Sequence, residues 1–245
     1  MKILITGAAG YLAGFVIKRL HTSNHSLTLF DRAEVEAEGD FIQGDITDFD
    51  DVKAACSGQD VVVHLVALVR ERFGKPHDLF ADVMVKGTWN VAEACVQQGV
   101  GKLINISSVV AIGSPQETDR AYRVGDPAHF RSRDLFYTLS KHLGEEIGRA
   151  YHQANDLAVI HLRPGIIAGD GANPDPENPG EDPGGHWFMY VHPEDVAQAV
   201  EQAIDSQTVR SGTFNVVAGH PHAKFDWQET AKKLGYQPQH NWEDV

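Results

Sequence analysis

The chain of 245 residues has few cysteines and no long apolar run. Its two cysteines, Cys56 and Cys95, lie in segments with helical periodicity and lack metal-ligand spacing, so a disulfide framework is excluded and both thiols are expected to be buried. No stretch approaches the roughly 18 apolar residues that a membrane-spanning helix needs. The start, MKILITG, carries no charged leader before an apolar stretch. We therefore expect a cytoplasmic protein that is neither secreted nor embedded in a membrane.

Basic residues are also scarce relative to acidic ones. The 21 lysines and arginines against 34 aspartates and glutamates give a formal net charge of -13 at pH 7. Such a chain repels polyanions over most of its surface, which excludes nucleic acid and an anionic membrane as partners. Because 42% of the residues are hydrophobic, there is enough apolar material for one sizeable core. We expect residues 1–245 to form a single domain.

Short β-rich apolar runs alternate with longer segments of helical periodicity. This alternation is typical of parallel strands joined by crossover helices, and it predicts a doubly wound α/β sheet. The runs are residues 2–6, 26–31, 60–67, 102–108, 157–163 and 212–218. Residues 47–58 predict a short helix that starts with a capping residue, Thr47, and stops at a glycine. The segment 168–186 is rich in proline and glycine and predicts a long loop.

The first apolar run leads directly into a glycine-containing turn, TGAAGYLAG, at residues 6–14. Glycines at such a junction let a pyrophosphate approach the backbone, and the start of the following helix offers free N–H groups and a favourable dipole. Gly7 and Gly10 are the main candidates. The other turn residues predicted to contact the cofactor are Ala9, Tyr11 and Leu12. An ordinary strand-to-helix connection is the alternative interpretation.

Acidic residues follow the next two segments. Asp31 ends the second run, where a carboxylate accepts hydrogen bonds from ribose hydroxyls and repels a 2′-phosphate, so NAD is favoured over NADP. Arg32 beside it either pairs with a 2′-phosphate or is a solvated surface cation. Asp45 and Ile46 follow the third segment at the edge where ligands of open α/β sheets lie. We expect Asp45 either to bind the adenine amino group or to cap a helix.

A tyrosine and a lysine lie four residues apart in the helical segment 134–152, so they share one helix face. An ammonium group near a phenol favours the phenolate and lowers the phenol pKa from about 10, so Tyr137, with Lys141 beside it, could take or give a proton. Lys141 could also reach the ribose hydroxyls of the cofactor, so both residues are expected to contact it. Ser108, at the end of the run 102–108, would orient a substrate oxygen. A Tyr-x-x-x-Lys pattern or a serine pair after a strand also occurs by chance. The same helical segment carries an apolar stripe on a different face, formed by Leu139, Leu143, Ile147 and Ala150.

Together these stretches resemble the extended short-chain dehydrogenase/reductase superfamily, in its NAD-dependent epimerase/dehydratase branch, over nearly the whole chain. The matching stretches are TGAAGYLAG, FDR, GDITD, VVVHLVAL, VKGTWNVAEAC, INISSVVAIG, YTLSK, LRPGIIAGD and YVHPEDVAQAV. The resemblance implies a Rossmann fold with a small C-terminal substrate-binding region, from about residues 165–192 and 219–245.

The resemblance also assigns roles to individual residues. It implies that Ser108 is the catalytic serine, Tyr137 the acid/base and Lys141 its partner. Cofactor contacts are further implied for Leu65, Ala67 and Pro164, and a structural role for Asp195.

Four departures from the family pattern bear on function. Ala13 occupies the third glycine position, which tolerates alanine because only close helix-to-strand packing is needed there. Met84 stands where an asparagine is common, which puts any contact through that amide in doubt. Residues 166–189 form a much shorter segment than in members that act on nucleotide sugars, so a small substrate is implied. Val109 and Val110 follow Ser108 in place of an acidic pair, which disfavours a dehydratase.

The C-terminal region is loosely similar to uronate dehydrogenases. A uronate carboxylate needs a cation, ideally a bidentate arginine, yet no lysine or arginine occurs from Pro164 to Val209. An anionic substrate would therefore depend on cations in two other loops. These cations are Arg70, Arg72, Lys75, Arg120, Arg123, Arg131 and Arg133.

The sequence thus predicts an NAD-dependent oxidoreductase that transfers hydride to or from a small, sugar-like hydroxyl or carbonyl compound. The alternatives are a sugar epimerase with tightly held cofactor and a dinucleotide-sensing protein without turnover. We expect no metal site, because His64 and His192 are interpreted as packed or capping residues, and His220 and His222 as part of an exposed turn. The resemblance also allows a homodimer formed through helices such as 134–152.

Overall fold

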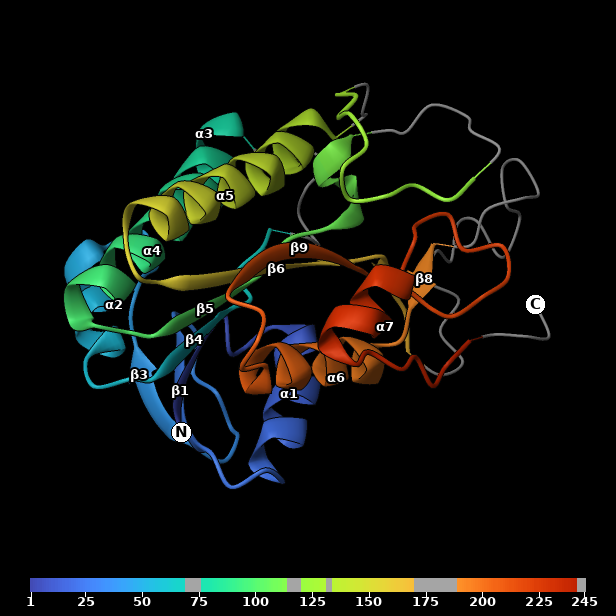
Figure 1. Ribbon diagram of the computed structural model, residues 1–245. Coiled ribbons are helices and arrows are strands. Elements are labelled where there is room, and N and C mark those ends of the chain that lie inside the picture. The colour runs from blue at the N-terminus through green and yellow to red at the C-terminus, as the bar shows by residue number, and fades with distance from the viewer. Residues whose placement is uncertain (69–75, 114–119, 131–133, 170–188, 242–245) are drawn as a thin grey trace.

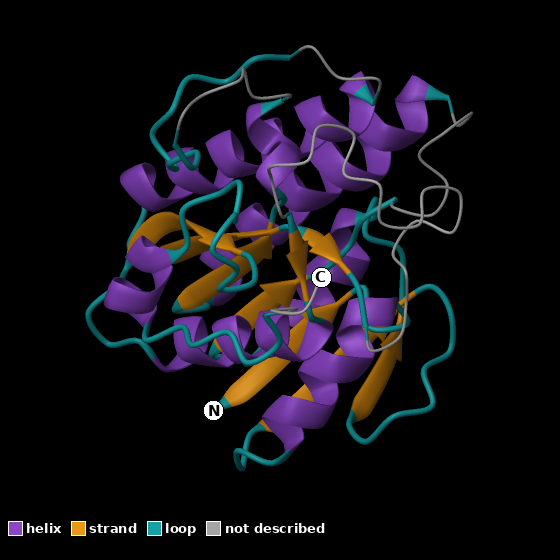
Figure 2. Cartoon of the chain, turned by 90° about the vertical axis from the view of Figure 1, so that its right-hand side faces the viewer, coloured by secondary structure: helices purple, strands orange, loops and turns teal. Residues whose placement is uncertain are grey.

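A seven-stranded parallel sheet lies at the centre of the molecule, with helices on both faces (Figures 1 and 2). The structure is a computed structural model that describes residues 1–68, 76–113, 120–130, 134–169 and 189–241. The strand order is β3-β2-β1-β4-β5-β6-β9, so the chain winds outward from β1 first in one direction and then in the other. The predicted doubly wound α/β fold is confirmed.

The strands coincide with the six apolar runs, with one addition. They are β1 (Lys2–Thr6), β2 (Ser26–Asp31), β3 (Asp40–Gln43), β4 (Val61–His64), β5 (Lys102–Ile106), β6 (Ala158–Pro164) and β9 (Ser211–Val216). Both faces of the inner strands are covered by helices, which explains their nearly continuous apolar sequence. The edge strand β3 is mostly exposed and has no such run. A separate pair, β7 (Ile166–Ile167) and β8 (Tyr190–Val191), follows β6.

The helices form two layers. On one face lie α1 (Tyr11–His21), α6 (Pro193–Asp205) and α7 (Gln228–Leu234). On the other face lie α2 (Phe49–Cys56), α3 (His77–Phe80), the π-helical segment η1 (Ala81–Lys86), α4 (Gly87–Gln98) and α5 (Leu135–Ala154). A short 3-10 helix, η2 (Val109–Ile112), follows β5. Alternate strand residues feed the two cores: Ile3 and Ile5 pack toward α1 and α6, whereas Leu4 packs toward α2 and α4.

The short predicted helix is present but starts one residue later than expected. Asp48, and not Thr47, is the N-cap of α2, and its carboxylate accepts hydrogen bonds from the N–H groups of Asp50 and Asp51. Aspartate is the stronger acceptor at this position because its charge also complements the helix dipole. Cys56 at the end of this helix and Cys95 in α4 are both buried, as expected.

Three of the four residues in the apolar stripe of α5 face outward, whereas Ile147 is half-buried and packs against the core. Leu139 and Leu143 are each 38% exposed, and Ala150 is exposed too. The buried face of α5 is instead formed by Tyr137, Thr138, Ser140, Lys141, Gly144, Glu145 and Gly148. The expected separation between the stripe and the Tyr137–Lys141 face is therefore confirmed, with the polar face turned inward.

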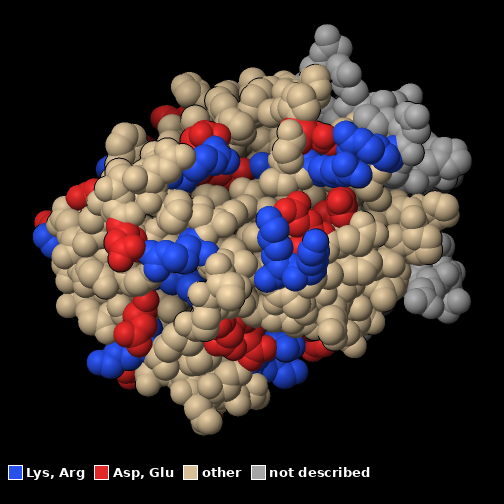
Figure 3. Space-filling view, in the orientation of Figure 1, with Lys and Arg blue, Asp and Glu red and all other residues tan. Residues whose placement is uncertain are grey.

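The surface carries both signs of charge. On the face drawn in Figure 3, acidic and basic side chains are interspersed and neither forms a continuous field. None of the described helices is long and apolar enough to cross a membrane. Of the long loop expected at 168–186, only Ala168 and Gly169 lie within the described residues.

Candidate active site

The glycine turn connects β1 to the start of α1. Gly7 has φ +78°, and a Cβ atom there would come within 2.9 Å of the Val66 backbone nitrogen, so a larger residue is excluded on both counts. Gly10 is the N-cap of α1, and within the described residues no side chain caps this end and no acid lies in the first turn. The free backbone N–H groups at the start of α1 and the positive end of the helix dipole therefore suit a pyrophosphate. Ala13 is fully buried against the sheet, as the tight packing at the third glycine position requires.

Asp31 joins the end of β2 to this turn. One carboxylate oxygen accepts a hydrogen bond from the Ala9 N–H at 3.0 Å, and the other accepts one from the Ala33 N–H at 3.0 Å. The carboxylate thus lies next to the glycine turn, where a bound dinucleotide would place its adenosine ribose. The Arg32 side chain is 67% exposed, and its Nη1 lies 3.8 Å from Asp45 Oδ2.

Asp45 forms a turn after β3 and does not cap α2. Its Oδ1 accepts hydrogen bonds from both the N–H and the hydroxyl of Thr47 at 2.8 Å. Burial acts to raise the pKa of Asp45, but these two hydrogen bonds and the Arg32 charge outweigh it, so the pKa is lowered. The capping alternative is therefore wrong, since Asp48 performs that role. Contact of Asp45 with adenine stays a prediction.

The remaining predicted cofactor contacts lie along the same edge of the sheet. Leu65 and Ala67 are half-buried directly after β4. Ile46 is buried, and its carbonyl accepts a hydrogen bond from the Asn90 side chain at 3.0 Å. Pro164 is buried as the last residue of β6.

A buried hydrogen-bond chain runs beneath the turn from β1 to α4. Thr88 donates its hydroxyl proton to the Met84 carbonyl at 2.6 Å, so it accepts from His64 Nε2 at 3.2 Å. His64 therefore carries its proton on Nε2, and its Nδ1 accepts from the Thr6 hydroxyl at 2.7 Å. Burial, together with the nearby Lys141 charge, lowers the pKa of His64 to about 3. The histidine is a packed residue, as expected, and stays neutral.

Tyr137 and Lys141 are both buried on the inner face of α5. Lys141 Nζ lies 5.9 Å from the centre of the Tyr137 ring and donates a hydrogen bond to the Ile106 carbonyl, at the end of β5, at 2.7 Å. Burial lowers the pKa of Lys141 to about 8, against the opposing charge of Glu145. An ammonium ion beside a phenol favours the phenolate.

Ser108 follows β5 two residues after Ile106, as the N-cap of η2. Its Oγ accepts the Val110 N–H at 3.4 Å, and it is 9% exposed. The α5 helix packs directly against η2, where the His142 Nδ1 atom lies 3.2 Å from the Ala111 carbonyl oxygen. The structure thus places Ser108 and the Tyr137–Lys141 face on two elements in mutual contact.

Sequence reasoning missed an ion pair behind this face. Glu145, one helical turn after Lys141, accepts hydrogen bonds from Arg163 Nε at 2.7 Å, from Arg163 Nη2 at 2.6 Å and from the Ser107 hydroxyl at 2.5 Å. The available signal was the spacing: a glutamate four residues after the lysine lies on the same helix face.

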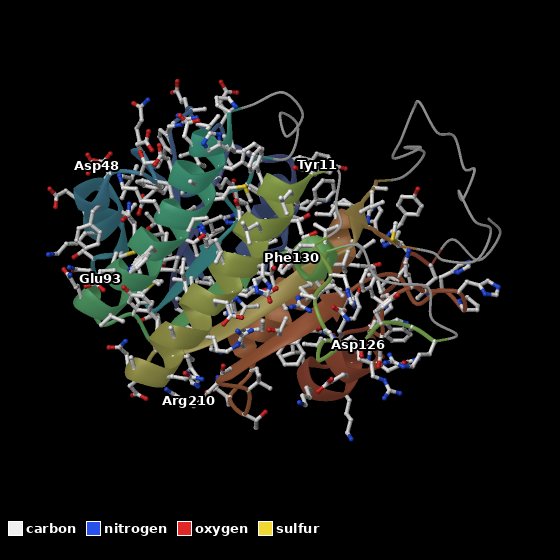
Figure 4. The ribbon with its side chains drawn as sticks, turned by 90° about the horizontal axis from the view of Figure 1, so that it is seen from above. Tyr11, Asp48, Glu93, Asp126, Phe130 and Arg210 are labelled. Carbon is white, nitrogen blue, oxygen red and sulfur yellow. The ribbon has the colours of Figure 1, made fainter. Side chains whose placement is uncertain are left out.

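Two of the candidate loop cations lie within the described residues. Arg120 forms a bidentate ion pair with Asp126, and Arg123 Nε lies 4.0 Å from Asp226. In Figure 4, Asp126 and Tyr11 of α1 lie toward one side of the molecule, whereas Asp48 and Glu93 lie toward the opposite side. The other cations, Arg70, Arg72, Lys75, Arg131 and Arg133, lie outside the described residues.

The histidines expected to be structural behave accordingly. His192 caps α6 by accepting the Glu194 N–H on Nδ1 at 3.2 Å, and residues 221–222 form an exposed turn beside His220. Potential metal-ligand atoms of His192, Glu194 and His240 lie within 4.8 Å of one another. Asp195 accepts the backbone N–H groups of Gln239 and His240, which fixes the C-terminal segment.

Comparison with known proteins places these features in a family. A family model described as the NAD dependent epimerase/dehydratase family matches residues 3–182. An L-arabinose 1-dehydrogenase (NAD(P)(+)) of Haloferax volcanii is 26% identical over 98% of this chain and 97% of its own length. A uronate dehydrogenase of Pseudomonas syringae pv. tomato is 28% identical over 97% of this chain and 81% of its own.

Solved structures agree on the fold. A short-chain dehydrogenase/reductase superfamily protein from Agrobacterium tumefaciens with bound NAD superposes with a TM-score of 0.84. The alignment covers 98% of this chain and 93% of that chain, at 19% sequence identity.

Proposed function

The chain belongs to the NAD dependent epimerase/dehydratase family, and on that premise we propose that it is an NAD-dependent dehydrogenase of a small, neutral sugar. Tyr137 serves as the acid/base, Lys141 as its cationic partner and Ser108 as the group that orients the substrate oxygen. The observation that carries the proposal is the buried Tyr137–Lys141 pair, set at the same sheet edge as the uncapped start of α1.

The sheet register brings the two halves of this site together. Thr6, His64 and Asn105 are neighbours across β1, β4 and β5, so the glycine turn after Thr6 and the Lys141 contact at Ile106 lie at the carboxyl ends of strands separated by one strand. Two strand spacings amount to roughly 10 Å. An extended dinucleotide can therefore have its pyrophosphate at α1 and its nicotinamide near Tyr137.

The proposed reaction divides the chemistry between cofactor and protein. Bound at the glycine turn, NAD would supply the acceptor for the hydride that leaves the substrate carbon bearing the hydroxyl. Tyr137, as phenolate, accepts the hydroxyl proton, so the substrate leaves as a carbonyl compound. Ser108 holds the same oxygen in place, and Lys141 favours the phenolate by its charge. In the reverse direction Tyr137 donates that proton.

A neutral sugar is favoured by two observations. The Haloferax volcanii relative, named for L-arabinose, matches this chain over nearly the full length of both proteins. Of the described arginines, Arg120 is held by Asp126 and Arg163 by Glu145, so neither is open to a bidentate bond with a carboxylate. A uronate would therefore depend on Arg123, whose Nε lies 4.0 Å from Asp226, or on cations outside the described residues.

The test is NADH formation by purified protein with a panel of free aldoses, uronates and simple alcohols. NADH growth with a neutral aldose supports the proposal, whereas growth with uronates alone overturns the substrate class. Cofactor that copurifies with the protein, without net NADH from any compound, indicates the epimerase instead. An absence of both cofactor binding and turnover rejects the whole assignment.

The catalytic role has its own test in Tyr137→Phe, which removes only the hydroxyl. We expect turnover to fall by about 10³-fold or more while NAD binding stays close to wild type. Tyr151→Phe, on the outer part of the same helix, is the matched control and should retain turnover. Near wild-type turnover of Tyr137→Phe removes this residue from the mechanism.

We further propose that the outer faces of α4 and α5 form a homodimer interface. Trp89 on α4 is 56% exposed, and Leu139 and Leu143 on α5 add further apolar surface. Trp89 and Leu143 line a surface groove of about 610 Å³, together with Phe49 and Val85. A second copy of the same helices would cover this apolar face, and contiguous exposed apolar surface is typical of interfaces.

A further inference from the structure

One face of the sheet changes from apolar to polar along its strands. On the face under α4 and α5, Leu103 of β5 is followed by Asn105 and Ser107, and Val159 of β6 is followed by His161 and Arg163. All four polar residues are buried. They contact one another or α5: Asn105 Nδ2 lies 3.0 Å from His161 Nδ1, and Ser107 and Arg163 bind Glu145. The polar half adjoins the end of the sheet where Lys141 lies.

The ion pair in this layer is costly to bury. Glu145 is 1% exposed and Arg163 is 5% exposed, so both charges have left water almost completely. A well-packed apolar pair of similar volume is often as stable or more stable than such an ion pair, because it avoids the desolvation penalty. Stability alone therefore does not account for these charges, and their place behind Lys141 provides another reason.

The charges that face Lys141 can be enumerated element by element within the described residues. On β4, His64 is neutral because burial lowers its pKa to about 3. On β6, burial lowers the pKa of His161 to about 4, which leaves Arg163 as the cation of that strand. On α5, Tyr137 precedes Lys141 by one turn and Glu145 follows it by one turn. Burial acts to raise the pKa of Glu145, but its bonds to Arg163 and Ser107 outweigh this and keep it an anion.

We propose that Glu145 is a positioning residue for the Tyr137–Lys141 pair. Its carboxylate ties α5 to the ends of β5 and β6 through Ser107 and Arg163, and its negative charge keeps Lys141 in the ammonium form. Ser107 immediately precedes Ser108, so the same carboxylate also fixes the strand end from which the catalytic serine projects. This inference rests on the proposed function for its catalytic part, but the charge coupling between Glu145 and Lys141 does not depend on turnover.

The first experiment uses Glu145→Gln, which removes the negative charge and keeps the shape of the side chain. In the wild type, kcat/KM should fall as the pH rises through about 8, where Lys141 loses its proton. In Glu145→Gln, Arg163 is left as an uncompensated cation, so this falling limb should move to lower pH by about one unit. Glu145→Asp keeps the charge and should leave the limb near its wild-type position. Glu146→Gln, an exposed glutamate on the same helix, is the matched control and should leave the profile unchanged.

A second readout requires no substrate. The affinity for NADH, titrated by fluorescence across the same pH range, should weaken as Lys141 is neutralised, and Glu145→Gln should shift that transition in the same direction. If the wild type oxidises none of the compounds but this shift is observed, the proposed function fails and the role of Glu145 stands. A folded Glu145→Gln whose transitions coincide with wild type in both readouts overturns the inference.

Two milder variants decide the case in which Glu145→Gln does not fold. Ser107→Ala removes one hydrogen bond but keeps the charge, and Glu145→Asp shortens the carboxylate by one methylene. Both should lower kcat about tenfold while the KM for NAD stays within about twofold, which corresponds to misplaced catalytic groups rather than lost cofactor binding. Wild-type kcat in both variants overturns the positioning role.

Discussion

Lys141→Met should make the protein more stable and inactive at the same time. The buried ammonium group is held against its desolvation cost, as the lowering of its pKa from 10.5 to about 8 shows. Methionine is an unbranched residue of similar length that fills the same space without a charge. Removal of the charge should therefore release the cost of burying it, while turnover is lost with the cationic partner of Tyr137.

The size of the effect follows from the pKa. A lowering from 10.5 to about 8 corresponds to about 3 kcal/mol of destabilisation by the charged lysine at neutral pH. Methionine cannot donate to the Ile106 carbonyl, and this loss costs about 1 to 3 kcal/mol. We therefore expect a net gain of up to about 2 kcal/mol at pH 7, and the upper limit corresponds to a rise in Tm of about 4 to 8 °C for a chain of this size.

The dependence on pH identifies the cause. Between pH 8 and 10.5 the unfolded wild-type lysine binds more protons than the folded one, so wild-type stability rises with pH in this window. Lys141→Met has no titrating group here, so its stability should not rise in this window. Its gain in stability over the wild type should therefore be full below pH 8 and should decline toward pH 10.5. Urea unfolding at pH 7, 8, 9 and 10 measures the difference, with Lys18→Met as a surface control. An advantage that does not change with pH would refute the reasoning.

The remaining predictions concern other parts of the site. Asp31→Ala should weaken NAD about tenfold or more and narrow its advantage over NADP, as measured by Kd for both cofactors; unchanged selectivity would show that the ribose is recognised elsewhere. Arg163→Met should lower the free energy of unfolding by about 3 to 5 kcal/mol, because it leaves the Glu145 carboxylate buried and unpaired; the exposed Arg210→Met is the control for urea unfolding. Leu143→Glu should convert the dimer to a monomer in light scattering, and a monomeric wild type would contradict the proposed interface.

The fold was predictable because burial on two faces leaves a simple pattern in the sequence. Runs such as 61–64 are apolar throughout, since helices cover both sides of the strand. The edge strand β3 lacks such a run because most of it is exposed, and only the acidic residues after it marked its end. The glycine turn follows β1 and Asp31 ends β2, as their spacing predicts, because one strand-helix-strand unit sets that spacing.

The orientation of α5 could not be derived from its own sequence. Periodicity separates the face of Leu139 and Leu143 from the face of Tyr137 and Lys141, but it does not say which face is buried. The buried face is determined by β5 and β6, because polar groups near their carboxyl ends form hydrogen bonds with Glu145 and Lys141. These contacts join residues far apart in the sequence, so no local sequence pattern predicts them. Hydrophobicity alone would bury the face of Leu139 and Leu143.

This orientation links the chemistry of the site to the surface of the molecule. Because the polar face of α5 lies inward to meet Ser107 and Arg163, Ile147 still packs against the core but Leu139 and Leu143 do not. Those side chains are therefore displaced to the outer face, where water contact is unfavourable and a second copy can relieve it. On the proposed assignments, the apolar dimer face is thus a structural consequence of the buried catalytic pair. The contacts that hold this pair all come from one chain, so loss of the dimer should affect stability before it affects the geometry of Tyr137 and Lys141.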